Sequence, residues 1–381
     1  MIMDTKFKPK KLEIDLQYMK EILIKLLNIP SPAGFTDEVV RFTCQELGRM
    51  AIPYEITRRG AIRADLEGRE NSPDRAIVAH LDTIGAMVKR LKDNGRLEIV
   101  PVGTWSSRFA EGARVTIFTD TKHYRGTILP IKAAGHIYNT QIDSLPIDWE
   151  NVELRIDEVC HSKTDMEILG INVGDFVAVD PQPEICASGF INSRHLDDKA
   201  GVAVMLAVAK CIVEAGVILP VDCHLLFTIS EEVGSGASAI LHQDVAQMVT
   251  IDAGPSAPGQ STDEYGVTIC MQDSAGPFDY HLTHKLIEIC EKNEIPYRRD
   301  LFKYYRCDSA SAIEAGNDIR TALVCFGTDA THGYERCHER TLQALARLLL
   351  YYANSERLIA RDSNELGSLS GFPTLPFKYK A

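Results

Sequence analysis

Two adjacent glutamates, Glu231 and Glu232, come directly after the apolar run in FTISEEVGSG, residues 227–236. Taken alone, the pair fits a strand end at a solvated sheet edge, with the two glycines beginning a turn. Other predicted strands along the chain also end in acidic residues or histidines, and the start of one predicted helix carries two more acidic residues. The residues concerned are His80 with Asp82, Asp252, His332, and Asp197 with Asp198.

In an open α/β sheet, functional side chains collect at the carboxyl ends of the strands, so these groups are expected to meet at one edge. Each has a structural explanation by itself, such as a helix cap, a turn or a surface histidine. Together they would repel and desolvate one another unless cations lay among them. Two histidines and three carboxylates form the mixed donor set that Zn²⁺, Co²⁺ or Mn²⁺ accept, and one bridging carboxylate holds two ions about 3.5–4 Å apart. The sequence therefore indicates a two-metal hydrolytic site.

The glutamate pair then has two separate tasks. Adjacent residues that leave a strand point in different directions. One glutamate is therefore expected to bind metal, while its neighbour acts as a general base on the attacking water.

Length and composition narrow the class of protein. A chain of 381 residues is longer than a single core usually grows, so two domains are expected. The apolar content of 45% and the charged content of 25% are ordinary for a globular protein. The net charge of −12, without a cluster of lysines and arginines, argues against a nucleic-acid partner.

No targeting or membrane segment is predicted. The start, MIMDTKFKPKK, is charged, and LEIDLQYMKEILIKLLNI repeats its apolar residues at helical spacing instead of forming an unbroken apolar run. No other stretch approaches eighteen uncharged apolar residues, so the predicted location is the cytoplasm, without a membrane partner. Ten cysteines without a CxxC pair fit reduced, packed thiols rather than disulfides or a zinc ribbon.

The elements that must position the site begin with two predicted helices, one ending at about Asn28 and one over residues 36–50 with Thr36 as N-cap. A short apolar strand over residues 76–79 follows. From about residue 84 to 184, short β-like runs separated by turns replace the mixed pattern. This change is typical of a small all-β domain inserted into an α/β domain.

After the insertion, a buried helix is predicted from about Asp198. The apolar strands CHLLFTIS, AQMVTID and TALVCFG then alternate with helical stretches as far as the closing helix RTLQALARLLLYYAN. Such alternation predicts an α/β fold with a mainly parallel sheet covered by helices. The predicted parts are a discontinuous catalytic domain over residues 1–84 and 185–356, an inserted β-rich domain over 85–184, and an extended tail over 357–381.

The motifs HLDTIGAMV, HLDDKAG, SEEVGSGA, TIDAG and THG, in this order and spacing, resemble the M42 family of dinuclear metallo-aminopeptidases, which includes glutamyl and tetrahedral aminopeptidases. The resemblance covers nearly the whole chain up to about Glu356. It implies a zinc-peptidase type of fold and two divalent ions per subunit, Zn²⁺ or Co²⁺, with Mn²⁺ as a further possibility. It also implies that the insertion pairs subunits and that the dimers assemble into a hollow dodecamer.

Carried over residue by residue, the resemblance also assigns roles. Asp197 would bridge both ions. His80 and Asp252 would complete one metal site, and Glu232 and His332 would complete the other. Glu231 would be the general base, and Asp82 would orient His80.

This chain departs from the family at two places. The family commonly has an aromatic residue before the bridging aspartate, as in AFDNR, where this chain has HLDDK; Asp197 is chosen over Asp198 by alignment with that segment. The loop FGTDATHGYE also differs from the family before its histidine. His338 is not chosen as the ligand because it lies at the start of the closing helix, and His195 and His224 are interpreted as structural.

The function expected from these motifs is removal of N-terminal amino acids from short peptides. An amidase or deacylase acting on a small N-acylated peptide is the alternative enzyme, because related dinuclear sites serve both reactions and some similar sequences accompany synthesis of an acetylated dipeptide osmoprotectant. A non-catalytic scaffold with this fold is the third hypothesis. Loss of activity usually deletes a base or a ligand, and none is missing from these motifs.

Overall fold

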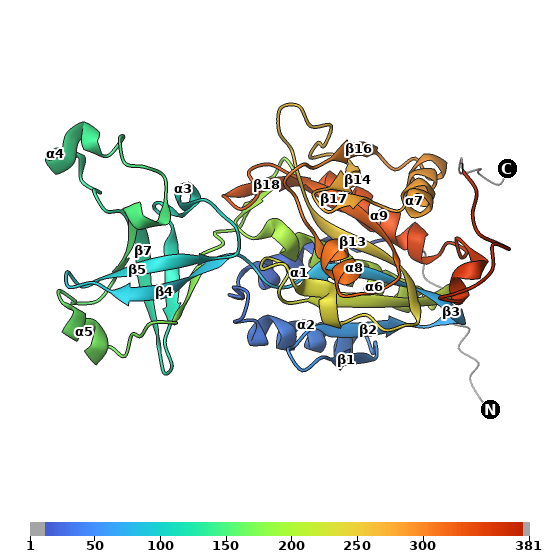
Figure 1. Cartoon of the computed structure of the whole chain (residues 1–381), viewed down its shortest axis with the longest axis horizontal. Coiled ribbons are helices and arrows are strands. Elements are labelled where there is room, and N and C mark those ends of the chain that lie inside the picture. Colours follow the sequence, from blue (N-terminus) through green and yellow to red (C-terminus); the bar gives the residue numbers. More distant parts are fainter. Residues whose placement is uncertain (1–11, 376–381) are drawn as a thin grey trace.

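The computed structural model of the chain describes residues 12–375 and contains a large α/β domain joined to a smaller β-barrel (Figure 1). The charged first residues and the last residues of the predicted tail, 1–11 and 376–381, lie outside this part. Within residues 12–375, no helix is long and apolar enough to cross a membrane. The ten cysteines are all free thiols, and most are buried.

A mixed sheet of nine strands forms the centre of the α/β domain. Its order is β1 (Tyr54–Ile56), β2 (Ile62–Leu66), β12 (Leu219–Thr228), β3 (Gly68–His80), β13 (Val245–Pro255), β17 (Arg320–Thr328), β14 (Val267–Asp273) and β15 (Gly276–Pro277), with β16 (Tyr297–Leu301) beside β14. Strands β12, β3, β13 and β17 are mutually parallel, whereas β2 and β14 run antiparallel to them. Four carboxyl ends therefore meet at one edge.

Strand β3 is longer than the predicted 76–79 segment. Its second half is buried and includes the apolar run 76–79, but its first half, from Gly68 to Ser72, is mostly exposed. The exposed half pairs with β12, where Leu219 lies opposite Gly68. Its hydrogen bonding to β12 extends the strand without an apolar run in the sequence, so periodicity alone did not indicate it.

Helix α6 (Leu196–Ala215) is the predicted buried helix and is the most enclosed helix of the domain. It packs against α1 (Leu16–Leu27), α9 (Glu339–Ala353), β3 and β13. Nine of its twenty residues are alanine or valine, and these small side chains allow the close approach of its neighbours. The other helices of this domain are α2 (Asp37–Arg49), α7 (Tyr280–Lys292), α8 (Asp308–Glu314) and the 3₁₀ turn η3 (Gly236–Ala239).

The second predicted helix is α2, with Thr36 at the N-cap position, although the Thr36 side chain makes no capping hydrogen bond. Asp37 and Glu38 in its first turn instead favour the positive end of the helix dipole.

The insertion is a closed antiparallel barrel, seen at the left of Figure 1. Its core is separate from that of the α/β domain and includes Val88, Ile99, Val115 and Leu154. Three short helices, α3 (Ser107–Ala110), α4 (Gly135–Tyr138) and α5 (Lys163–Ile168), connect its strands. The strands, in their order around the barrel, are β4 (Gly85–Leu91), β5 (Arg96–Val102), β8 (Val152–Ile156), β7 (His123–Pro130), β6 (Arg114–Phe118) and β9 (Phe176–Val179).

A small three-stranded sheet joins the return from the barrel to the last part of the chain. It consists of β10 (Glu184–Ile185), β11 (Phe190–Ser193) and β18 (Glu335–His338). Strand β11 leads into α6 and β18 leads into α9, so this sheet fixes the starts of both helices. The tail contains a 3₁₀ turn, η4 (Ala360–Ser363), held by the ion pair between Asp362 and Arg320.

Candidate metal centre

All the residues singled out for chemistry lie around one end of the parallel strands. His80 is the last residue of β3, and the glutamate pair begins three residues after the end of β12. Asp252 is near the end of β13, His332 lies in the loop between β17 and β18, and Asp197 is in the first turn of α6. Four of these five positions thus lie near or beyond the end of a parallel strand, as the predicted sheet requires.

Asp197 lies at the centre of this cluster. Its Oδ1 is 3.1 Å from His80 Nε2, and its Oδ2 is 3.4 Å from His332 Nε2. His332 Nε2 is also 3.4 Å from Glu232 Oε2, while His80 Nε2 is 3.9 Å from Glu231 Oε2. One carboxylate therefore faces two imidazoles that come from different strand ends.

Ligand atoms gather in two overlapping groups, each within 4.8 Å: His80, Asp197 and Glu232 in one, and His80, Glu231 and Asp252 in the other. Both groups contain the His80 imidazole, so the donors form one continuous cluster. Asp252 is only 3% exposed.

Asp82 supports the cluster by hydrogen bonding to the backbone of the two glutamates. Its carboxylate accepts hydrogen bonds from the backbone N–H groups of Glu231, at 3.1 Å, and Glu232, at 3.3 Å. The His80 ring bonds through Nδ1 to the main-chain carbonyl of Asp82 at 2.9 Å, and the nearest carboxylate oxygen of Asp82 lies 3.6 Å away. Asp82 therefore positions both the imidazole and the glutamate pair.

Glu335 is a buried carboxylate that sequence reasoning did not select. Its two oxygens accept from the backbone N–H groups of Asp197 at 3.1 Å and His332 at 2.9 Å, so it holds two cluster residues in place. The signal was available, because Glu335 ends the quoted loop THGYE, three residues after His332. Asp198, next to Asp197, bonds the His80 backbone N–H at 3.1 Å.

Negative charge is in excess throughout the cluster. Burial, together with the charge of Asp197, raises the pKa of Glu232 to about 7 and that of Glu335 to about 8. Burial also raises the pKa values of Glu231 and Asp252 well above their usual range. The cationic side chains of the protein therefore do not balance the negative charge of these carboxylates.

The donor set fits divalent cations. Two imidazole nitrogens and several carboxylate oxygens converge within coordination reach of one another, which is the mixed N/O environment that Zn²⁺, Co²⁺ and Mn²⁺ accept. Cations placed here would offset the charge that otherwise raises the carboxyl pKa values. The buried Oδ1 of Asp198, which has no hydrogen-bond partner, adds a further uncompensated oxygen beside the cluster.

A cavity of about 670 Å³ opens onto the cluster. Asp197, Glu231, Glu232, Asp252 and His332 line one side of it. The remaining lining comes from the barrel, the loop after the glutamates, the segment before α8 and the loop that carries His332: Gly103, Thr104, Val233, Gly234, Tyr304, Tyr305, Arg306 and Thr331. A small substrate entering this cavity would meet the carboxylates and imidazoles directly.

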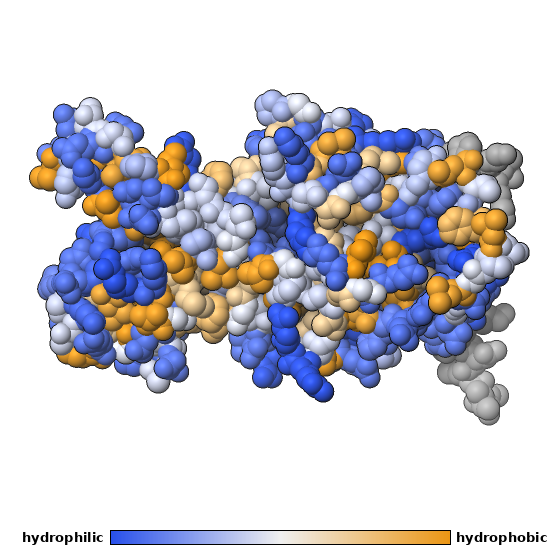
Figure 2. All heavy atoms as spheres, in the orientation of Figure 1, coloured by the Kyte–Doolittle hydropathy of each residue, from blue (hydrophilic) through white to orange (hydrophobic). Residues whose placement is uncertain are grey.

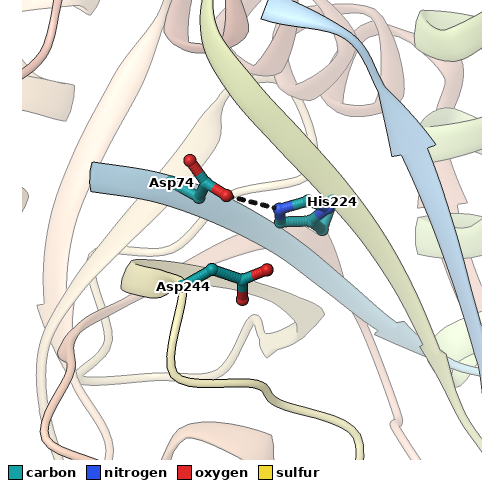
Figure 3. Close-up of side chains that lie close together, drawn as sticks. All are labelled: Asp74, His224 and Asp244. Carbon is teal, nitrogen blue, oxygen red and sulfur yellow. Dashed lines mark hydrogen bonds and ion pairs between the residues drawn. The ribbon is translucent and has the colours of Figure 1, made fainter. Parts of the chain in front are cut away.

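A second group of possible ligands, Asp74, His224 and Asp244, lies close together elsewhere in the α/β domain (Figure 3). The guanidinium of Arg63 already lies among them: its Nη2 is 2.6 Å from Asp244 Oδ2 and 3.1 Å from His224 Nε2. His224 also bonds Asp65 at 2.6 Å and Asp74 at 3.1 Å. This group is therefore a network of ion pairs around an arginine, which agrees with the structural interpretation of His224.

The network predicts a pH dependence of stability. Burial alone would lower the pKa of His224, but hydrogen bonds to Asp65 and Asp74 outweigh it and raise the pKa to about 9. Because the folded pKa exceeds the unfolded value, the stabilisation is fully present below about pH 6.5 and is lost as the pH rises through 9. Its size is on the order of 3 kcal/mol.

We expect the free energy of unfolding, measured by urea titration, to fall more between pH 7 and pH 10 for the wild type than for His224→Gln. The variant keeps a similar side-chain volume and lacks the titrating group. Equal slopes for both proteins would show that His224 is not protonated in the fold.

A family model described as M42 glutamyl aminopeptidase matches residues 60–348. The Bacillus subtilis (strain 168) protein named "Putative aminopeptidase YhfE" is 40% identical over 336 residues, which is 88% of this chain and 97% of the relative.

Among the solved structures with a similar fold are two peptidases. The aminopeptidase APDkam598 from the archaeon Desulfurococcus kamchatkensis aligns with a TM-score of 0.81 at 23% identity, over 94% of this chain and 98% of that chain. The Pyrococcus horikoshii TET1 peptidase, described as assembling into a tetrahedron or a large octahedral shell, aligns with a TM-score of 0.78 at 23% identity, over 88% of this chain and 99% of that chain. These alignments confirm the predicted α/β fold with its small inserted β domain.

Proposed function

The chain belongs to the M42 glutamyl aminopeptidase family, and on that basis we propose that the cluster at the strand ends is the centre at which N-terminal residues are removed from short peptides. Membership makes the protein a metal-dependent aminopeptidase. The predicted aminopeptidase is thus confirmed at the level of the family, and neither the deacylase nor the scaffold hypothesis is favoured.

The observation that carries the proposal is the position of Asp197 between the imidazoles of His80 and His332. A carboxylate with one oxygen towards each imidazole is suited to bridge two cations. We assign His80 and Asp252 to one ion, and Glu232 and His332 to the other. Zn²⁺ or Co²⁺ matches this donor set, and Mn²⁺ is also compatible.

When bound, two such ions supply Lewis acidity, which makes water nucleophilic near neutral pH and polarises a carbonyl group. The chain's own residues supply the proton transfer. Glu231 lines the cavity and is placed to take a proton from the attacking water and to return it to the leaving amine. The Asp82 carboxylate keeps Glu231 in this place through the backbone N–H bond.

The test is release of amino acid from an unblocked dipeptide by metal-stripped protein, before and after Zn²⁺, Co²⁺ or Mn²⁺ is restored. The expected result is turnover only with metal, and only with the free amine. The N-acetylated form of the same dipeptide is the matched control. Hydrolysis of the acetylated form alone would contradict the aminopeptidase proposal and support the deacylase hypothesis.

The barrel is proposed to pair subunits, with dimers assembling further into a dodecamer. Hydrophobic residues are exposed on it, and Figure 2 shows hydrophobic groups over this part of the surface. Val159 is 88% exposed, Ile168 78% and Ile137 76%. The oligomeric shell of the Pyrococcus horikoshii relative also supports the proposal.

We expect light scattering coupled to size-exclusion chromatography to give a mass that is a multiple of the dimer. Val159→Asp combined with Ile168→Asp would lower that mass by placing charge where an apolar contact is proposed. A wild-type protein that elutes as a monomer at micromolar concentration would contradict the pairing.

A further inference from the structure

One ligand of the candidate metal centre is held by the barrel. The segment 103–105 leaves the end of β5 and reaches the cavity of the α/β domain. There the main-chain carbonyl of Thr104 accepts a hydrogen bond from His332 Nδ1 at 2.8 Å. The ring of His332 is therefore oriented by a residue that is about 230 positions away in the sequence and belongs to the other domain.

This bond decides which nitrogen of His332 faces the cluster. A carbonyl oxygen can only accept, so Nδ1 must carry the proton. Nε2 is then free to act as a ligand, and it faces Asp197 and Glu232 at 3.4 Å each. A hydrogen bond at the second ring nitrogen is the usual way in which a metal-binding imidazole is oriented.

His332 needs such a restraint more than His80 does. The His332 side chain is 29% exposed, whereas that of His80 is 1% exposed and is enclosed by the sheet. The Glu335 carboxylate accepts a hydrogen bond from the backbone N–H of His332, so it fixes the loop and not the imidazole ring. The Thr104 carbonyl restrains the ring itself.

Segment 103–105 is itself held in place by the barrel. Trp105 Nε1 donates to the Gly85 carbonyl at 2.9 Å, and Trp149 Nε1 donates to the Trp105 carbonyl at 3.3 Å. The two indole rings meet edge to face, with their centroids 4.8 Å apart. These contacts fix the position of segment 103–105 and, with it, the position of the Thr104 carbonyl.

Gly103 brings this segment close to the cluster. Its φ of +81° lies in the left-handed region, and an added Cβ would lie 2.9 Å from Ile84 Cγ2 and 3.5 Å from Glu232 Cβ. A side chain at this position would push the segment away from its present path. The close approach thus depends on glycine.

We propose that the main-chain carbonyl of Thr104 is a positioning group for His332, through which the barrel completes one of the two metal sites. The inference rests on the proposed function, because it takes His332 as a ligand. It predicts that a change in the barrel, at a residue that binds no metal, weakens one site and spares the other.

The test is titration of Co²⁺ into metal-free, full-length protein, followed by its visible absorption and by calorimetry. The wild type is expected to bind two ions per subunit. In Gly103→Ala the first ion should bind as in the wild type, and the second about 10–100-fold more weakly. Gly112→Ala is the matched control, because Gly112 is also in the barrel, has a φ of +79°, and an added Cβ there meets nothing within 4 Å.

A double variant separates positioning from a general loss of fold. His332→Ala should weaken the binding of the same ion, and adding Gly103→Ala to it should weaken that site no further. Equal loss in Gly112→Ala, an additive double variant, or unchanged affinity in Gly103→Ala would overturn the inference. A wild type that binds fewer than two ions would overturn the proposed function together with it.

Trp149→Phe provides a second route if Gly103→Ala fails to give the circular dichroism spectrum of the wild type. It keeps an aromatic ring against Trp105 and removes the N–H that donates to the Trp105 carbonyl. Selective weakening of the same ion, by a smaller factor, would support the inference, and wild-type affinity for both ions would overturn it.

Discussion

Glu231→Gln is expected to lower kcat for peptide hydrolysis by about 10²–10⁴-fold, the usual contribution of a general base, while both metal ions stay bound. Glutamine has nearly the same shape as glutamate and cannot take a proton. Glu231 lines the cavity beside Asp197 and is 3.9 Å from His80 Nε2, so it is close to the reacting groups. Its backbone N–H would still bond Asp82, which keeps the loop in place.

The measurement pairs steady-state kinetics on an unblocked dipeptide with elemental analysis of the purified variant. Glu291→Gln is the control, because it makes the same chemical change at an exposed residue of α7. Turnover within about threefold of the wild type would remove Glu231 from the proton transfer. Loss of metal along with activity would instead make Glu231 a ligand.

Asp197→Ala is expected to abolish activity and metal binding together. Its two carboxylate oxygens face His80 and His332, so a single substitution removes a donor from both proposed ion positions. We expect the affinity for each ion to fall by at least about 100-fold, which exceeds the roughly 10–100-fold effect of groups that only orient a ligand. The free energy of unfolding without metal should also fall. Burial alone would raise the pKa of Asp197, but its bonds to His332 and His80 outweigh burial and hold the pKa below the usual range, so the ionised carboxylate stabilises the fold.

Metal affinity is measured by competition with a chelator, and stability by urea titration of the metal-free protein. Asp329→Ala is the control, because Asp329 lies three residues before His332 and its side chain is 54% exposed. A variant that keeps both ions at wild-type affinity would exclude Asp197 as the bridge. Asp198 would then be the next residue to test.

Several parts of the site could be predicted from the sequence because they are local. His80, Asp252 and the glutamate pair each come at or just beyond the end of a buried strand, so the apolar run and the polar ending are read together in a few residues. The rule that parallel strands present their carboxyl ends at one edge then brings these residues together without knowledge of the strand order.

Other parts depend on contacts between distant segments. The exposed half of β3 is set by pairing with β12, and no apolar pattern marks it. Asp82 was expected only to orient His80, yet its carboxylate also holds the backbone of Glu231 and Glu232. Which atoms a buried carboxylate reaches depends on how the strand ends are spaced, and periodicity does not contain that information.

The sequence by itself determined the class of fold, the family and the set of groups that meet at the sheet edge, because strand ends and motif spacing are local properties of the chain. Only the tertiary structure decided how those groups are held. The carbonyl of Thr104 in the barrel accepts from the ring of His332, and the carboxylate of Glu335 at the start of β18 accepts from its backbone N–H. Every residue has a main-chain carbonyl, so the residue type does not indicate which carbonyl orients a ligand. The role of the Thr104 carbonyl therefore becomes visible only in the structure of the two domains together.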